Sequence, residues 1–212
     1  MSIFSQGFFG RRDDMNRRPR VTRGRLPVRM LFALAAAVVM MTLLLPGSPP
    51  RADEVIEPPA SFLTGAFDGS PPTPAILWLT PEIQQQVEAV LGHRLAGLRL
   101  RYWRKGERSV WILNEIGKEE PITAGFVVES GRIVRVSVLV YRESRGYEIR
   151  YPQFRGQFEG VGLDAQGRLD RPIDGIAGAT LSVNAMIRMA RTALLLDRLS
   201  MPRSDGPQEV PK

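Results

Sequence analysis

The stretch that decides the fold is residues 122–141, which read ITAGFVVESGRIVRVSVLVY. Both halves are rich in β-branched residues, and they meet at Ser130-Gly131, a dipeptide typical of a tight turn. In the second half, valines at every second position alternate with Arg135 and Ser137. This alternation predicts that one face of the strand is buried and that the other contacts water. We therefore predict a β-hairpin with strands at 122–129 and 132–141.

Further hairpin and helix signals surround this stretch. A hairpin is predicted at 98–113, around a polar turn that contains Gly106. A helix is predicted to begin at the N-cap residue Thr80, which Pro81 follows, and to stop at Gly92. After a long loop at 142–172, an apolar stripe predicts a final helix over 181–199. This order of elements indicates an α+β fold, an antiparallel sheet with packed helices.

The first 50 residues are predicted to direct the protein out of the cytoplasm. Residues 1–29 hold eight arginines and two aspartates, whereas the rest of the chain holds 21 Lys and Arg against 20 Asp and Glu. The uncharged run at 30–45, MLFALAAAVVMMTLLL, would form a helix of about 24 Å, slightly short of a hydrocarbon core of about 30 Å. A basic flank before such a run is typical of a signal peptide or a short membrane anchor. A buried core helix is the alternative.

Five segments follow from these patterns. The residues between the apolar run and the β-rich region are dense in proline, which favours an extended spacer. The segments are a basic cytoplasmic tail at 1–29, a signal peptide or anchor at 30–50, a Pro-rich linker at 51–75, the folded domain at 76–200 and a flexible tail at 201–212. We expect the domain to lie in the periplasm, held at the cytoplasmic membrane or released by cleavage.

The composition excludes several classes of protein. With no cysteine, the chain has no disulfides, cysteine-ligated zinc, iron–sulfur cluster or thioether-attached haem. The single histidine, His93, rules out a two-histidine metal site, and we predict it to be a surface residue. Because the net charge of +7 comes almost entirely from the tail, a nucleic-acid partner is not expected. Redox chemistry in this chain would therefore need an organic cofactor.

The most specific short stretch is DGIAGATLS at 174–182. Its small residues, Gly175, Gly178 and Ala179, let another group approach the backbone closely. The helix that follows would present free amides and the positive end of its dipole to that gap, an arrangement that suits an anion. Thr180 stands at the helix entrance, and its hydroxyl can cap the helix or take a covalent substituent. An ordinary N-cap after a glycine turn is the alternative interpretation.

This stretch resembles the flavinylation motif of the FMN-binding domain family, in which an Asp, two variable residues and a small residue precede Gly-Ala-Thr. The sequence matches at Asp174, Gly178, Ala179 and Thr180, and it has Ala177 where Ser or Thr is usual. The family includes flavoprotein subunits of the Rnf and sodium-translocating NADH:quinone reductase complexes and the flavin domain of the nitrous-oxide-reductase regulator. The resemblance implies that a flavin transferase joins FMN to Thr180 by a phosphodiester bond after export. Ser182 is included in the predicted site as the nearest competing hydroxyl, which could instead cap the helix.

A second match lies upstream, where residues 138–146 read VLVYRESRG. The stretch resembles the family's strand followed by Glu, Thr or Ser, Pro and Gly, which lines the flavin; here Arg145 replaces the Pro. The resemblance places Glu143 and Gly146 in the cofactor site, where Glu143 would orient the ring, although it could simply end the strand. Nearby aromatic residues would cover the flavin ring or fill the core: Tyr141, Tyr147, Tyr151, Phe154 and Phe158.

The predicted function is that of an exported or membrane-anchored flavoprotein that carries FMN on Thr180 and transfers electrons between a membrane donor and an extracytoplasmic acceptor. An electron carrier or complex subunit is favoured over an independent oxidoreductase, because the chain has one domain and no nicotinamide-binding fingerprint. No catalytic residue and no metal ligand are assigned. The expected partners are a flavin transferase, membrane or periplasmic redox proteins and, through the N-terminal helix, the membrane. The alternative is a sensory or assembly module that binds flavin or another phosphate-bearing ligand without turnover.

Overall fold

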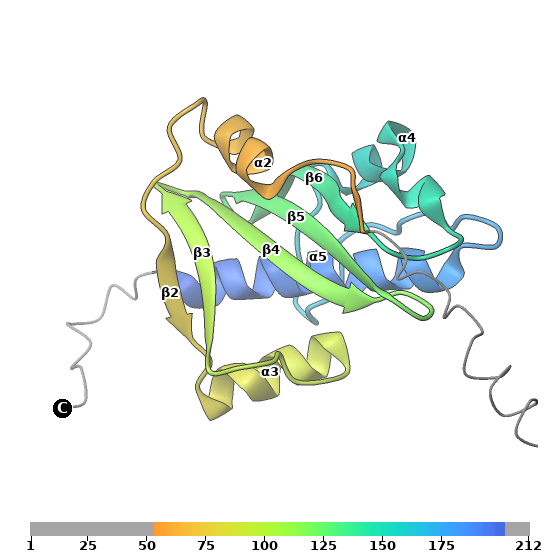
Figure 1. Ribbon diagram of the computed structural model, residues 1–212. Helices are drawn as coiled ribbons and strands as arrows, with labels where there is room; N and C mark the ends of the chain where they lie inside the picture. The colour runs from red at the N-terminus through yellow and green to blue at the C-terminus, as the bar shows by residue number, and fades with distance from the viewer. Residues whose placement is uncertain (1–52, 202–212) are drawn as a thin grey trace, which may run out of the picture. The chain divides into compact units, whose positions relative to one another are not determined.

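The computed structural model describes residues 53–201, and its framework is a six-stranded sheet in the order β1-β6-β5-β4-β3-β2 (Figure 1). All neighbouring strands are antiparallel. The strands are β1 (Glu54–Val55), β2 (Ala75–Trp78), β3 (Arg99–Lys105), β4 (Arg108–Ile116), β5 (Pro121–Glu129) and β6 (Arg132–Tyr141). The helices in this range are α2 (Pro59–Ala66), α3 (Pro81–Leu91), η1 (Tyr147–Arg150), α4 (Pro152–Arg155), η2 (Gly156–Phe158) and α5 (Thr180–Ser200). The predicted α+β fold is confirmed.

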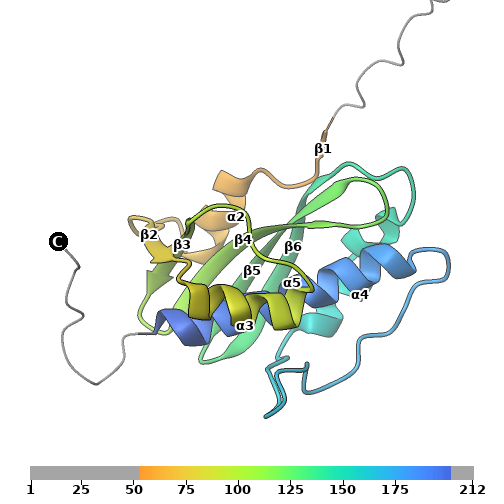
Figure 2. The same ribbon diagram turned by 90° about the horizontal axis from the view of Figure 1, so that it is seen from below.

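Helices cover both faces of the sheet (Figures 1 and 2). On one face, α5 and α3 pack in a large apolar cluster that joins Met186 and Met189 of α5 to Trp111 and Phe126 of the strands. On the other face, α2 inserts Phe62 into a smaller cluster with side chains of β4, β5 and β6. Burial on both faces supplies the apolar contact that stabilises the sheet.

The central hairpin has the predicted strands, but the prediction that one face of β6 contacts water is wrong. Val138 and its neighbour Leu139 point to opposite faces, and both are buried. The polar residues expected in water are paired instead: Ser137 Oγ donates to one oxygen of Glu57 at 2.5 Å, and Arg135 lies 2.7 Å from the other. Glu57 precedes α2, so the segment that covers this face also satisfies the polar side chains on it.

The predicted boundaries differ from the structure at the N-terminal side of the domain. The segment predicted as a linker at 51–75 contains β1, which pairs with β6, and α2, which begins with Pro59 in its first turn. Proline suits the first turn of a helix because its missing N–H has no intrahelical partner there. The proline density that indicated an extended spacer therefore belongs partly to a helix start.

The predicted ends of α3 and the predicted start of α5 agree with the structure to within one residue. At α3, Thr80 Oγ1 accepts from the Ile83 amide at 3.4 Å, and Gly92 ends the helix with φ 89°. α5 begins at Thr180, one residue before its predicted start. Among residues 53–201, no helix has the length and apolarity needed to cross a membrane. The predicted signal peptide or anchor at 30–50 lies outside the described residues.

Candidate functional site

A cleft of about 290 Å³ lies at the N-terminus of α5. Three segments line it: the turn between β4 and β5, the chain just after β6, and the start of α5 with the residues before it. The lining residues are Lys118, Glu143, Ser144, Arg145, Gly178, Ala179, Thr180, Leu181 and Ser182. The two sequence motifs, which 27 residues separate along the chain, therefore meet in one place.

Gly146 of the first motif lies close to Ala179 and Ser182 of the second. Its φ is 86°, and a Cβ at this position would lie 2.7 Å from Ser182 Oγ and 3.3 Å from the Ala179 Cβ. Both the backbone conformation and the lack of space therefore require glycine. The role of Gly146 is to let the chain after β6 pack directly on the first turn of α5.

The start of α5 has no side-chain cap. Ala179 occupies the N-cap position, and no described side chain bonds to the first-turn amides there. Thr180 is the first helical residue, so the expectation that its hydroxyl could cap the helix is wrong. The same holds for Ser182, which lies inside the first turn. The amides of this turn point out of the helix with the positive end of its dipole, and they remain available to an anion.

Gly178 sets the direction in which the chain enters the helix. Its φ of 79° lies in the left-handed region, and a Cβ built there would meet nothing within 4 Å. Glycine is therefore needed for the backbone conformation, while the space beside it is open. This open space borders the cleft and the exposed Thr180.

Two hydroxyls in the first turn of α5 differ in accessibility. Thr180 is exposed, whereas Ser182 is only 3% exposed and packs beside Gly146 and Tyr141. Burial raises the pKa of Tyr141, and a hydrogen bond with Ser182 partly offsets this effect. Thr180 is thus the hydroxyl that a reagent from solvent can reach.

Two cations border the cleft. Arg145 is exposed and forms no ion pair within the described part of the chain, whereas Lys118 Nζ lies 2.8 Å from the exposed Glu119. Next to Thr180, Leu181 leaves an apolar side chain 50% exposed. Helix amides and cations suit a phosphate, and an exposed apolar side chain beside them suits the face of a flat ring.

Residues 117–195 match the family model described as FMN-binding domain. This part of the chain is similar to the FMN-binding domain family. The matched range begins in the β4–β5 turn and ends within α5, so it includes every residue that lines the cleft. No curated protein matches the chain. The residues present fit FMN: the uncapped helix start and the two cations suit its phosphate, and the exposed Thr180 lines the same cleft as Gly178, beside which the space is open.

Glu143 positions one wall of the cleft. Its Oε1 accepts hydrogen bonds from the backbone amides of Lys118, of Glu119 at 2.8 Å and of Glu120 at 3.1 Å. These three bonds fix the β4–β5 turn and hold Lys118 at the cleft. The structure thus assigns this carboxylate a positioning role, and its predicted contact with the flavin ring remains a prediction.

Asp174 and the predicted aromatic cover lie apart from the cleft lining. Asp174 is exposed, and its amide donates to Gln157 Oε1 at 2.7 Å, which ties the start of the motif to the segment after α4. Tyr141, Phe154 and Phe158 are buried in the core. Tyr147 and Tyr151 are exposed and pack edge to face, with ring centroids 5.9 Å apart. Of the five aromatic residues predicted to cover the flavin, only this exposed tyrosine pair is available to do so.

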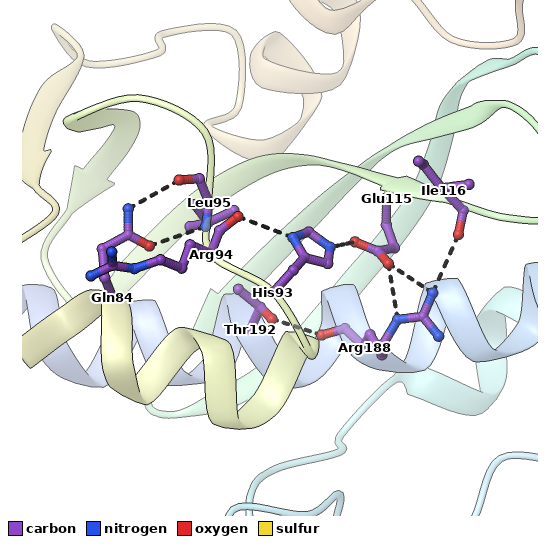
Figure 3. Close-up of polar contacts among 8 residues, drawn as sticks. All are labelled: Gln84, His93, Arg94, Leu95, Glu115, Ile116, Arg188 and Thr192. Atoms are coloured by element: carbon purple, nitrogen blue, oxygen red, sulfur yellow. Dashed lines mark hydrogen bonds and ion pairs between the residues drawn. The ribbon is translucent and has the colours of Figure 1, made fainter. Parts of the chain in front are cut away.

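The sequence interpretation did not identify two features near this domain's cleft. Lys118 was not among the predicted site residues, and its only signal in the sequence is a positive charge in the turn before β5. The second feature is a hollow of about 470 Å³ with His93, Glu115 and Arg188 in its lining. Glu115 Oε2 lies 2.9 Å from His93 Nε2, and its Oε1 accepts from Arg188 Nη2 at 2.7 Å and Nε at 3.0 Å (Figure 3).

Proposed function

We propose that this domain carries FMN covalently on Thr180 and passes electrons between a membrane donor and an extracytoplasmic acceptor. The proposal rests on the different accessibility of the two hydroxyls at the uncapped start of α5. Thr180 is exposed in the cleft, whereas Ser182 is buried. FMN, when bound, supplies the redox chemistry. The protein supplies the attachment point, the charge around the phosphate and the surface that a redox partner contacts.

The attachment is a phosphodiester bond between Thr180 Oγ1 and the FMN phosphorus. Oγ1 loses its proton as the new P–O bond forms, and an activated flavin nucleotide loses the group that occupied that position on phosphorus, so the protein gains FMN less one water. A flavin transferase supplies the activated donor. The first-turn amides of α5 and the side chains of Lys118 and Arg145 stabilise the phosphate charge during and after attachment.

The exposed setting of the cleft favours an electron carrier over an enzyme with a closed active site. Lys118, Arg145, Thr180 and Leu181 are all exposed, so a flavin held here stays within reach of a partner protein. A covalent bond keeps the cofactor in place at such an open site. The apolar run at 30–45 would hold the domain at the periplasmic face of the membrane, where both the transferase and a membrane donor are accessible.

The central test compares Thr180→Ala with Ser182→Ala in the full chain co-expressed with a flavin transferase. The wild type and Ser182→Ala should gain the mass of FMN less one water and fluoresce on a denaturing gel, and Thr180→Ala should show neither signal. Thr180 is exposed and its side chain makes no hydrogen bond in the described residues, so its loss should change stability by no more than about 0.5 kcal/mol. Thr180→Ser keeps the hydroxyl and should retain label.

Two outcomes would overturn the proposal. Covalent flavin on Thr180→Ala would make Ser182 the next acceptor to examine. Labelled protein whose flavin is neither reduced nor reoxidised by membranes of the source organism would instead support a binding module without electron transfer.

A further inference from the structure

One region of the sheet has no helix over it on the α2 face. β2 is an edge strand, and its register with β3 places Ile76 opposite Arg101 and Trp78 opposite Arg99. Residues directly opposite each other share a face of the sheet. Between these pairs, Leu77 and Leu100 turn to the other face and pack against the main core. Ile76, Trp78, Arg99 and Arg101 therefore form one outward surface, called here the β2–β3 patch.

The β2–β3 patch is both apolar and positively charged. Trp78 is 61% exposed and Ile76 is 42% exposed, and because they share one face of the same strand they form a contiguous apolar surface and not isolated exposed side chains. Arg99 and Arg101 are exposed and form no ion pair with any described residue. Two cations thus stand directly across from two exposed apolar side chains.

The β2–β3 patch is exposed because α2 does not extend over it. On the same face of β3, Trp103 packs against the α2 cluster and is partly buried. α2 packs against β4, β5 and β6, and Figure 1 shows no helix in front of β2. The exposed tryptophan and isoleucine are therefore a surface feature and not part of a core under α2.

We propose that the β2–β3 patch docks the domain onto an anionic lipid surface. A tryptophan ring suits the boundary between headgroups and acyl chains because it is apolar over most of its area and has one polar N–H. Arginines beside it attract anionic headgroups, and a short apolar side chain adds area to the buried contact. The patch has all three components on one face.

Two other occupants are disfavoured by the same residues. A symmetric contact with a second copy would bring the two arginine pairs together, which costs energy through like-charge repulsion. Addition of a strand to β2 is limited because β2 has only four residues and follows Pro71, Pro72 and Pro74, which lack backbone donors. The arginine-rich segment at 1–29 is itself basic and would be repelled.

Chain length also favours the lipid surface, and this step rests on the membrane anchor proposed above. The apolar run ends at Leu45, and β1 begins at Glu54. The eight residues between them extend over roughly 30 Å at most. A domain on such a tether stays near the headgroups, so even a modest attraction of the patch for lipid is enough to orient it.

The test uses full-chain protein in lipid nanodiscs, and the lack of cysteine in the chain allows a single labelled position. Ile76→Cys carries an environment-sensitive dye in the patch, and Gln85→Cys, at an exposed position of α3 on the other side of the sheet, is the matched control. With phosphatidylglycerol present, the dye at 76 should shift to the blue and be quenched by spin-labelled lipids. The dye at 85 should do neither, and neither dye should respond in phosphatidylcholine alone.

Loss of the arginines distinguishes docking from simple proximity. Arg99→Gln with Arg101→Gln should lower the ratio of docked to undocked domain by roughly 30-fold, because each basic residue near an anionic surface contributes about 1 kcal/mol. Added salt should weaken docking in the wild type and have little effect in the variant. Equal dye responses at 76 and 85, or an unchanged response in the double variant, would overturn the proposal and favour an acidic protein as the occupant. A failed anchor would show itself differently, because the protein would not incorporate into nanodiscs at all.

Discussion

Two hollows border the turn between β4 and β5, and they differ in how their polar groups are used. The cleft at Thr180 has a volume of about 290 Å³, and the hollow at His93 has about 470 Å³. In the larger hollow, both oxygens of Glu115 are paired, one with His93 and the other with Arg188. In the smaller cleft, the first-turn amides of α5 have no side-chain cap, and Arg145 has no ion-pair partner among the described residues.

Unsatisfied hydrogen-bond donors therefore indicate a ligand site better than the volume of a hollow does. A buried carboxylate whose partners are already in place gains little from a ligand and loses much when a partner is removed. Free amides and an unpaired cation have the opposite property, because they gain a partner only when an anion arrives. Substitutions at the larger hollow should therefore change stability, and substitutions at the smaller cleft should change flavin attachment.

The largest effect is expected at Glu115, which is only 5% exposed and bonds to two elements besides its own strand. Glu115→Gln keeps the size of the side chain but removes the charge that Arg188 and His93 face. We expect a loss of about 2–3 kcal/mol in the free energy of unfolding, measured by chemical denaturation. The exposed Glu88, changed to Gln, is the control and should stay within about 0.5 kcal/mol of the wild type.

Flavin content per folded Glu115→Gln molecule should match that of the wild type. If Glu115→Gln were as stable as the wild type, or if the folded variant lost flavin, the two hollows would not differ in role as expected, with the larger one serving stability and the smaller one flavin attachment.

A smaller stability effect and a larger attachment effect are expected at Gly178. Its φ of 79° costs a non-glycine residue about 1–2 kcal/mol, and a β-branched side chain suits this conformation least. Gly178→Val should therefore lose covalent flavin, since the chain can no longer enter α5 at the angle that presents Thr180. Asparagine tolerates the left-handed conformation, so Gly178→Asn should keep measurable attachment.

Mass spectrometry gives the flavin content of both Gly178 variants, and circular dichroism gives the folded fraction. If the valine and asparagine variants lose flavin equally while folded, then free space beside Gly178, and not its backbone conformation, is what attachment requires.

The smallest effect is expected from His93, whose side chain is 55% exposed. The Arg94 carbonyl and then the Glu115 carboxylate raise its pKa above the ordinary 6.5. Because the folded pKa is the higher one, the stabilising contribution is complete below about pH 6.5 and disappears as the pH rises through the folded pKa. Exposure keeps this contribution below about 1 kcal/mol.

The measurement for His93 is the free energy of unfolding of the wild type and of His93→Gln over a range of pH. The two should differ most on the acidic side and converge on the alkaline side, with equal flavin content throughout. A difference that does not change with pH would show that hydrogen bonding, and not the charge of His93, connects α3 to Glu115.

The predicted site residues show which parts of the cleft a sequence can reveal. Gly146, Gly178, Ala179, Thr180 and Ser182 were found because the motifs specify a backbone path, and the structure brings them together at the start of α5. Which of the two hydroxyls is accessible was not encoded locally. Ser182 is buried by Gly146, a residue 36 positions earlier in the chain.

The features that the sequence did not predict have the same origin. The water-exposed face predicted for β6 is covered by α2, whose sequence looked like a linker because of its prolines. The predicted surface position of His93 is confirmed, but the bond from its ring to the buried Glu115 carboxylate, 22 residues away, was not predicted. Neither the segment that covers β6 nor the distant carboxylate leaves a signal in the local periodicity.

The hairpin at 122–141, the limits of α3 and the small-residue entry to α5 could be predicted from the sequence alone, because turn residues, caps and alternation act between neighbours along the chain. The surroundings of Thr180, in contrast, depend on the packing of distant segments. Glu143 reaches back 25 residues to the Lys118 amide and fixes the wall of the cleft, and Arg188 of α5 reaches 73 residues back to Glu115. Such contacts depend on how whole elements pack, and packing is a property of the assembled core that no short stretch of sequence contains.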